Sequence, residues 1–227
     1  MASMKAIVTG HTQGLGAAIA LALLERGMPV LGLARGVSVA LQSRFPDLCT
    51  QTHIALNDSA TLDAWLATPA LSAFLDGCDE ALLINNAGTV QPVGALNDQD
   101  PLAVASAIGL NVAAPLMLAA AVARAMAARQ CRILHISSGA GRNAYPGWSV
   151  YGATKAALDH HARGVAQDAR PGVRICSLAP GVIDTPMQAE IRSTPEARFP
   201  IRQRFLDLHS QGQLASPAHS AQRVIDY

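Results

Sequence analysis

Six short apolar runs alternate with longer stretches rich in alanine and leucine. The runs, at residues 5–10, 29–34, 51–56, 81–88, 131–138 and 173–180, read KAIVTG, PVLGLA, QTHIAL, ALLINNAG, CRILHISS and VRICSLAP. Their β-branched and leucine content predicts six strands, and helical patterns separate most of them. Strands that are apolar on both faces and joined by helices predict an α/β fold with a doubly wound, Rossmann-like parallel sheet covered on both sides.

The pattern predicts a single domain over residues 1–227, because no repeat, low-complexity tract or Pro/Gly linker divides the chain. Residues 185–216 differ from the rest of the chain in composition, since they mix prolines, charged residues and two phenylalanines. We expect them to form helices and loops, inserted after the sixth strand, that cover a pocket. The residues after 217 predict a terminal helix.

Composition narrows the classes of partner. The formal net charge is +1 and the arginines are scattered, which argues against nucleic acid or an anionic membrane and favours a small ligand. The four cysteines are far apart and contain no CxxC pair, so we expect free thiols in a reducing cytosol. The adjacent His160 and His161 point about 100° apart on a helix and predict no metal site. His11 and His135 are interpreted as turn and core residues.

The N-terminus enters an apolar strand without the features of a signal peptide. The most apolar long stretch, residues 111–130, contains Pro115 and Arg124, which argues against a membrane span. We therefore expect a cytoplasmic protein that does not bind membranes.

A glycine-rich turn, VTGHTQGLG, joins the first strand to the first helix. Gly10, Gly14 and Gly16 would allow a tight turn and close approach of the backbone to a pyrophosphate at the helix N-terminus. The spacing GxxxGxG differs from the common GxGxxG fingerprint, so the turn alone is compatible with a cofactor loop or a tight connection.

The second strand is followed by Arg35 and by no acidic residue. Arginine there favours the 2′-phosphate of NADP over NAD, although NAD remains an alternative.

A proline interrupts the helix predicted around IGLNVAAPLM. Pro115 cannot bond to the carbonyl of Asn111 and should kink the helix. The freed carbonyl could hold a water, or the kink could only fit the helix to the sheet.

Tyr151 and Lys155 lie four residues apart in SVYGATKAALDHH, one above the other on a helix. The pKa of a free tyrosine is about 10, and a nearby cation that stabilises its phenolate would make it a useful acid–base catalyst. Ser138, at the end of the fifth strand, could meet Tyr151 across the ligand crevice. An isolated YxxxK also fits a buried tyrosine and a solvated lysine, but its place beside the other motifs favours catalysis.

Together these motifs resemble the short-chain dehydrogenase/reductase family in its single-domain form. The resemblance runs through TGHTQGLG, NNAG at 85–88, Asn111, Ser138, the Tyr151/Lys155 pair and PGVIDT at 180–185. It implies that Tyr151 donates a proton to a substrate carbonyl, that Ser138 holds the carbonyl, that Lys155 binds the nicotinamide ribose, and that the Asn111 carbonyl positions a water. It also implies cofactor contacts from Gly10, Gly14, Leu15, Gly16, Asn86, Ala87, Gly88, Ile183 and Thr185.

The segment PGVIDTPMQAEIRS…RFLDLHSQGQLASP is similar to the branch containing sepiapterin reductase and bacterial benzil reductase, which implies reduction of vicinal dicarbonyl compounds with NADPH. Trp148 is a candidate substrate contact, and core packing is the alternative for this and the neighbouring aromatic residues. Two departures stand out. Ala55 occupies a position where the family often has an acid, and the chain ends in the terminal helix where a seventh strand is normal.

The leading hypothesis is an NADPH-dependent carbonyl reductase. A nucleotide-binding sensor or scaffold without turnover is the alternative, prompted by the missing strand. Alanine-rich helices around 112–128 and 150–169 and the resemblance predict a homodimer or homotetramer.

Overall fold

The computed structural model describes residues 3–226 and contains one parallel sheet with the strand order β3-β2-β1-β4-β5-β6. Met1, Ala2 and Tyr227, which belong to the predicted domain and terminal helix, lie outside the described residues. The chain order reverses between β1 and β4, and such a reversal creates a crevice at the carboxyl ends of the strands. The predicted doubly wound fold is confirmed. Its strands are β1 (Met4–Thr9), β2 (Val30–Ala34), β3 (Cys49–His53), β4 (Glu80–Asn85), β5 (Gln130–Ile136) and β6 (Val173–Leu178).

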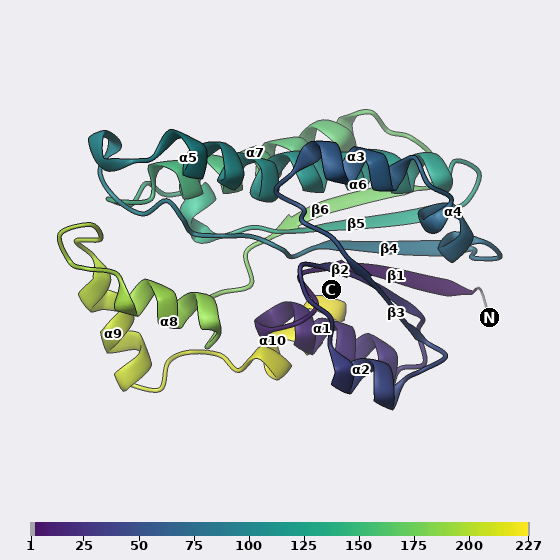
Figure 1. Ribbon diagram of the computed structural model, residues 1–227, viewed down its shortest axis with the longest axis horizontal. Coiled ribbons are helices and arrows are strands. Elements are labelled where there is room, and N and C mark those ends of the chain that lie inside the picture. Colours follow the sequence, from purple (N-terminus) through teal and green to yellow (C-terminus); the bar gives the residue numbers. More distant parts are fainter. Residues whose placement is uncertain (1–2, 227) are drawn as a thin grey trace.

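Helices cover both faces of the sheet (Figure 1). Successive side chains of a strand point to opposite faces, so Ile7 joins one buried cluster with Leu118 while Val8 joins the other with Ile19. The layer with Leu118 consists of α3 (Ser59–Leu66), α4 (Ala70–Leu75), α5 (Pro101–Ile108), α6 (Ala114–Ala125) and α7 (Ser149–Gln167), and the opposite layer of α1 (Gly14–Glu25), α2 (Val39–Arg44) and α10 (Pro217–Ile225).

The predicted strand positions hold except at their ends. The third run begins two residues later than β3 and continues three residues beyond it. Its last residues leave the sheet, where Ile54 and Leu56 stay buried as part of the core. The runs at 81–88 and 131–138 likewise extend past β4 and β5 into loops. The loops beyond these strands line the crevice.

The predicted break at Pro115 takes the form of a π turn, η2 (Gly109–Ala113), between α5 and α6. Proline has no N–H for the carbonyl four residues earlier, and just before it the Ala114 N–H bonds to the Gly109 carbonyl, five residues back. By length and composition, Pro101–Ala125 is apolar enough to cross a membrane. In this fold it packs on the sheet, with Leu118 and Val122 fully buried in the core.

The segment predicted to cover a pocket forms α8 (Pro186–Ser193) and α9 (Arg202–Ser210), which project together to one side of the main body (Figure 1). An isolated bridge between Ile183 and Ala215 closes the segment at its base. Two short 3-10 helices, η1 (Leu96–Asp98) and η3 (Gly139–Gly141), lie in loops. Within residues 3–226, β6 ends the sheet and no seventh strand pairs with it.

Candidate functional site

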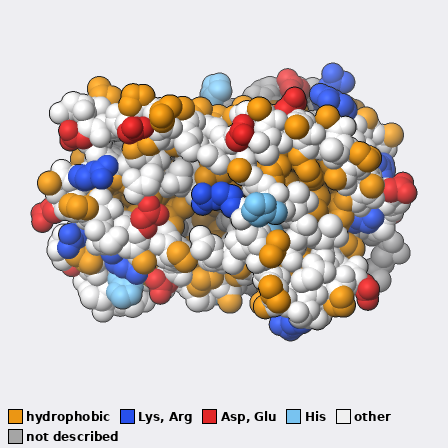
Figure 2. Space-filling view, in the orientation of Figure 1, with side chains coloured by type: hydrophobic (Ala, Val, Ile, Leu, Met, Phe, Trp, Pro, Cys, Tyr) orange, Lys and Arg blue, Asp and Glu red, His pale blue; other side chains and the backbone are white. Residues whose placement is uncertain are grey.

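A cavity of about 1050 Å³ follows the carboxyl ends of the strands and extends under α8 and α9. Figure 2 shows the molecule hollowed near the middle of one face, with hydrophobic side chains on the walls. Gly16 and Asn111 do not line the cavity but support residues that do. The predicted residues that line it are Gly10, Gly14, Leu15, Arg35, Asn86, Ala87, Gly88, Ser138, Trp148, Tyr151, Lys155, Ile183 and Thr185.

The glycine positions of the turn restrict side chains. Gly10 and Gly14 have φ values of 70° and 55°, a region that glycine adopts readily. A Cβ on Gly16 would lie 2.1 Å from the Gly10 carbonyl oxygen. The turn therefore leaves an open cradle at the N-terminus of the 12-residue α1, where backbone N–H groups favour a phosphate.

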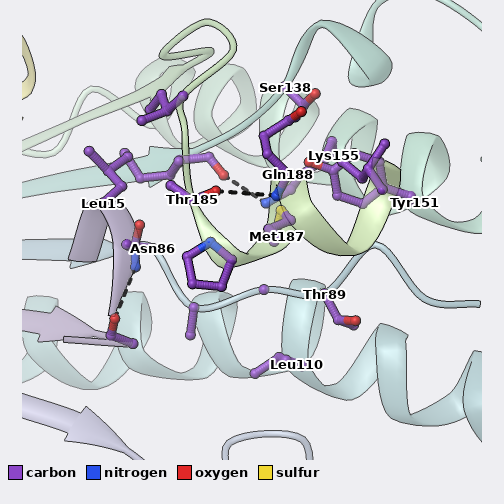
Figure 3. Close-up of a pocket in the computed structure, with 18 of the residues that line it drawn as sticks. Leu15, Asn86, Thr89, Leu110, Ser138, Tyr151, Lys155, Thr185, Met187 and Gln188 are labelled. Carbon is purple, nitrogen blue, oxygen red and sulfur yellow. Dashed lines mark hydrogen bonds between the residues drawn. The ribbon is translucent and has the colours of Figure 1, made fainter. Parts of the chain in front are cut away.

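Thr9 ties the NNAG loop to the end of β1. Its hydroxyl accepts hydrogen bonds from the Asn86 and Ala87 N–H groups, both at 2.9 Å, and the Asn86 side chain donates to the Thr9 carbonyl at 3.0 Å. These bonds fix the floor of the cavity between β1 and β4. Figure 3 shows Leu15 and Asn86 on one side of the site, and Ser138, Lys155 and Tyr151 on the other.

Asn111 lies in the π turn, fully buried behind the cavity. Its side chain exchanges hydrogen bonds with the backbone of Thr89, at 2.9 and 2.8 Å, and donates to the Thr154 hydroxyl at 3.1 Å. Thr154 in turn donates to the carbonyl of Tyr151. The side chain of Asn111 thus joins the π turn, the loop after β4 and the helix that carries Tyr151.

Ser138, Tyr151 and Lys155 converge from two elements. Ser138 follows β5 and caps η3 by accepting from the Ala140 N–H at 3.2 Å. Tyr151 and Lys155 lie on the buried face of α7, as predicted from their spacing. The Lys155 nitrogen donates to the Ile136 carbonyl at 2.8 Å.

Burial dominates the titration of this group. It raises the pKa of Tyr151, and a hydrogen bond with Ser138 acts in the opposite direction. Burial also lowers the pKa of Lys155 to about 8, although the charge of Asp159 opposes this. The expected lowering of the tyrosine pKa by Lys155 is not seen in this structure, because desolvation of the phenolate outweighs the favourable contacts.

Arg35 lies exposed at the opposite end of the cavity, directly after β2. Among the described residues it makes no ion pair. Its guanidinium is therefore available to an anionic ligand, which is the environment that a 2′-phosphate requires.

An aromatic cluster forms the wall near Tyr151. Trp148 stacks on Phe199 with ring centres 4.6 Å apart and meets the Tyr151 ring edge to face at 5.3 Å. Phe199 is fully buried, whereas Trp148, Tyr145 and Phe205 also line the cavity. The two interpretations of these residues, core packing and pocket wall, therefore both apply.

Sequence reasoning missed two groups of lining residues. One follows β3 and continues on α5, where no motif marks it, and it includes Leu56, Asn57 and Ser106. The other belongs to α8 and α9 and includes Met187, Gln188, Ile191 and Arg204. The only signal for them was their place after a strand or in the atypical segment at 185–216.

The histidines and cysteines that the sequence analysis considered provide no second site among the described residues. His11 and His135 are buried in a turn and in the core, as interpreted from the sequence. The four cysteines are free thiols. Within residues 3–226, no group of three or more histidine, cysteine, aspartate or glutamate side chains could hold a metal ion.

The glycine cradle, the phosphate-compatible helix terminus and the unpaired Arg35 fit a nicotinamide dinucleotide that spans the cavity. The short chain dehydrogenase family model matches residues 4–196. A benzil reductase ((S)-benzoin forming) of Bacillus cereus is 33% identical over 96% of this chain and 91% of its own. Sepiapterin reductase of Rattus norvegicus is 33% identical over 96% of this chain and 88% of its own.

A solved structure agrees with these similarities. The crystal structure of a short-chain dehydrogenase/reductase from Burkholderia vietnamiensis is 52% identical, with a TM-score of 0.78 over 86% of this chain and 93% of that one. The chain therefore belongs to the short-chain dehydrogenase/reductase family, as an oxidoreductase of the branch with benzil and sepiapterin reductases that binds NAD(P)(H) and acts on small molecules.

Proposed function

We propose that the protein is an NADPH-dependent reductase that converts a small-molecule carbonyl, with vicinal diketones as the favoured class, to an alcohol. The observation that carries this proposal is the convergence of Ser138, Tyr151 and Lys155 on one end of a cavity whose other end holds the glycine turn and Arg35. Residues 1–227 would act as one catalytic domain, with 185–216 as its substrate-pocket helices.

Tyr151 is the proposed proton donor. Its raised pKa keeps the hydroxyl protonated at neutral pH, which is the form required for carbonyl reduction. The Ser138 hydroxyl would donate a hydrogen bond to the same carbonyl oxygen and orient it. When bound, the nicotinamide supplies the hydride for the carbonyl carbon.

Lys155 and Asn111 are the proposed supports of Tyr151. Lys155 would bind the nicotinamide ribose and hold a positive charge beside the tyrosine. The backbone carbonyl of Asn111 would position a water that connects Lys155 to solvent. The π turn supports this role, since Pro115 leaves that carbonyl without its usual helical partner.

The cofactor preference rests on Arg35, because an arginine without an ion-pair partner at the end of β2 suits the ribose 2′-phosphate of NADPH. NADH is the alternative cofactor for the same glycine turn. The pyrophosphate and adenosine would lie on Gly10, Gly14, Leu15, Gly16, Asn86, Ala87 and Gly88, and the nicotinamide carboxamide and diphosphate on Ile183 and Thr185.

The diketone class follows from the similarity to benzil reductases and from the aromatic wall. Trp148 and Tyr151 line the cavity together with Tyr145 and Phe205, and aromatic rings provide large apolar contacts for an aryl-substituted substrate. Trp148, Ser138 and Tyr151 are thus the proposed substrate contacts.

We also propose a homodimer or homotetramer in the cytoplasm. Leu102 and Ile108 on α5 are 81% and 41% exposed, and α6 and α7 carry small alanine side chains that permit close helix packing. Light scattering on the purified protein measures the assembly, and a monomer at micromolar concentration would contradict it.

The test of the activity is the oxidation of NADPH and NADH with benzil, acetophenone and benzaldehyde, in the wild type and in Tyr151→Phe. We expect NADPH-dependent turnover of benzil and a loss of about 10²–10⁴-fold in kcat for the variant. A folded Tyr151→Phe protein with full activity would remove the proposed acid. Cofactor binding without turnover of any carbonyl would favour the sensor or scaffold alternative.

A further inference from the structure

His11 lies in the glycine turn, directly after Gly10, but its side chain does not line the cavity. It is 1% exposed and its ring lies over Gly32 in β2. A Cβ on Gly32 would lie 2.5 Å from the His11 ring. The ring therefore fills a fixed space between the glycine turn and the second strand, and Gly32 makes room for it.

The Nε2 atom of His11 lies 2.7 Å from the Oε1 atom of Gln51, on the neighbouring strand β3. The same Oε1 accepts a hydrogen bond from the backbone N–H of Ser38 at 2.6 Å. Since Oε1 only accepts, His11 carries its proton on Nε2 and donates it to Gln51. This assignment follows from the hydrogen-bond pattern.

Gln51 also binds the backbone carbonyl of Ser38. Its Nε2 group donates to the Ser38 carbonyl at 3.2 Å and to Gln42 Oε1 at 3.2 Å. One carboxamide thus satisfies both backbone groups of a single loop residue. Ser38 also caps α2, because its hydroxyl accepts from the Leu41 N–H.

The residue fixed in this way ends the short loop that carries Arg35. Ala34 is the last residue of β2 and Val39 the first of α2, so residues 35–38 connect the two without regular structure. Gly36 lies near Thr12 of the glycine turn, since a Cβ on Gly36 would be 3.9 Å from the Thr12 methyl. Arg35, Gly36 and Thr12 all line the cavity.

We propose that His11 and Gln51 are positioning residues for cofactor selection: by clamping Ser38 to the glycine turn, they hold the Arg35 loop where the guanidinium meets a ribose 2′-phosphate. The inference rests on the NADPH preference proposed above. Neither His11 nor Gln51 lines the cavity. Their effect is conformational, because a loop held in its binding conformation loses less entropy when the ligand binds.

Two adenine nucleotides separate this role from general damage to the fold. Adenosine 2′,5′-bisphosphate carries the 2′-phosphate and 5′-AMP does not, so calorimetric dissociation constants for both report on the Arg35 loop without any turnover. We expect Gln51→Leu to weaken the bisphosphate about tenfold and 5′-AMP by less than about twofold, as the loss of a preorganised contact predicts. Gln213→Leu is the matched control, since the exposed Gln213 side chain donates to Gln211 outside the cavity, and both constants should stay unchanged.

His11→Phe keeps an aromatic ring over Gly32 and removes the hydrogen bond to Gln51. We expect the same selective loss at a smaller size, about threefold, because the two bonds between Gln51 and Ser38 remain. This variant also covers the case in which Gln51→Leu fails to fold. Equal weakening of both nucleotides, or no change in either, would overturn the proposal.

A double-mutant cycle with Arg35→Ala tests the route of the effect. If the clamp acts through Arg35, Gln51→Leu should change bisphosphate affinity by less than about twofold in the Arg35→Ala background. A full tenfold loss in that background would overturn the inference. A wild type that binds both nucleotides equally would overturn the NADPH preference and the inference together, whereas a selective wild type with an unchanged Gln51→Leu variant would overturn the inference alone.

Discussion

The nitrogen of Lys155 lies 5.8 Å from the centre of the Tyr151 ring, one helical turn along α7. Lys155 is buried among the residues that line the cavity near Tyr151, and its nitrogen donates a hydrogen bond to the Ile136 carbonyl. Two ionisable side chains are thus held in buried positions, Tyr151 with a raised pKa and Lys155 with a pKa lowered to about 8. A charge kept there without a full set of partners destabilises the folded protein.

The stability of the unliganded protein should therefore rise with pH through the titration of Lys155. The folded pKa of about 8 lies below the value of 10.5 for a free lysine, so between these limits the unfolded chain binds more protons and stability increases with pH. From pH 7 to pH 9.5 we expect the wild type to gain about 2 kcal/mol relative to Lys155→Met. Urea unfolding of both proteins at the two pH values measures this gain, and a constant difference would contradict it.

Much of the fold was predictable because most strands are apolar on both faces and the helices between them are amphipathic or alanine-rich. The proximity of two proposed catalytic residues was predictable for a different reason: Tyr151 and Lys155 are near in sequence and share a helix face. The sequence predicted that residues 185–216 cover a pocket, but not that Met187, Ile191 and Arg204 line it, since this depends on how α8 and α9 pack against the body. The direction of the Tyr151 pKa shift also needed the structure, because burial raises this pKa and the hydrogen bond with Ser138 lowers it.

His11 shows the same limit. Its sequence position indicates a turn, but nothing in the sequence reveals that Gln51, forty residues later, lies 2.7 Å from its ring. Parallel pairing of β2 with β3 brings them together, and register between strands that are distant in sequence cannot be deduced from the apolar pattern alone.

Two glycine-to-alanine variants should change stability in opposite directions. A Cβ on Gly16 would lie 2.1 Å from the Gly10 carbonyl oxygen, whereas a Cβ on Gly164, in α7, would meet nothing within 4 Å. We expect Gly16→Ala to lower the free energy of unfolding by about 1–3 kcal/mol through overpacking, with loss of nucleotide binding. Gly164→Ala should raise it by about 0.5–1 kcal/mol, because alanine is the better helix former. Chemical denaturation measures both, and a Gly16→Ala protein of wild-type stability would refute the tight-turn argument.

Arg35→Ala should change cofactor preference more than catalysis. Loss of a charge-assisted contact to the 2′-phosphate, worth about 1.5–3 kcal/mol, predicts a fall of roughly 10–100-fold in kcat/KM for NADPH. The value for NADH should change by less than about twofold. Arg44→Ala is the matched control, because Arg44 is an exposed arginine on α2 that pairs with Glu25 outside the cavity. Equal losses with both cofactors would place Arg35 outside 2′-phosphate recognition.

The hydrogen-bonded pair of the buried His135 and the partly exposed His161 predicts a loss of stability in acid. His135 is completely buried, and its Nε2 lies 3.0 Å from His161 Nδ1 while its Nδ1 lies 3.2 Å from the Asn85 amide nitrogen. The amide donates to Nδ1, so the His135 proton must sit on Nε2 and point to His161. Burial, with smaller contributions from the charges of His161 and Lys155, lowers the pKa of His135 to about 3.

Because the folded pKa of His135 lies below the value of 6.5 for a free histidine, its contribution to stability is complete above pH 6.5 and is lost as the pH falls toward 3. Between pH 7 and pH 5 the wild type should lose about 2 kcal/mol more than His135→Leu. His160→Leu, which removes the exposed neighbour of His161, should keep the acid sensitivity of the wild type. Urea unfolding at both pH values distinguishes the variants, and equal slopes for wild type and His135→Leu would mean that the buried imidazole gains its proton without unfolding the core.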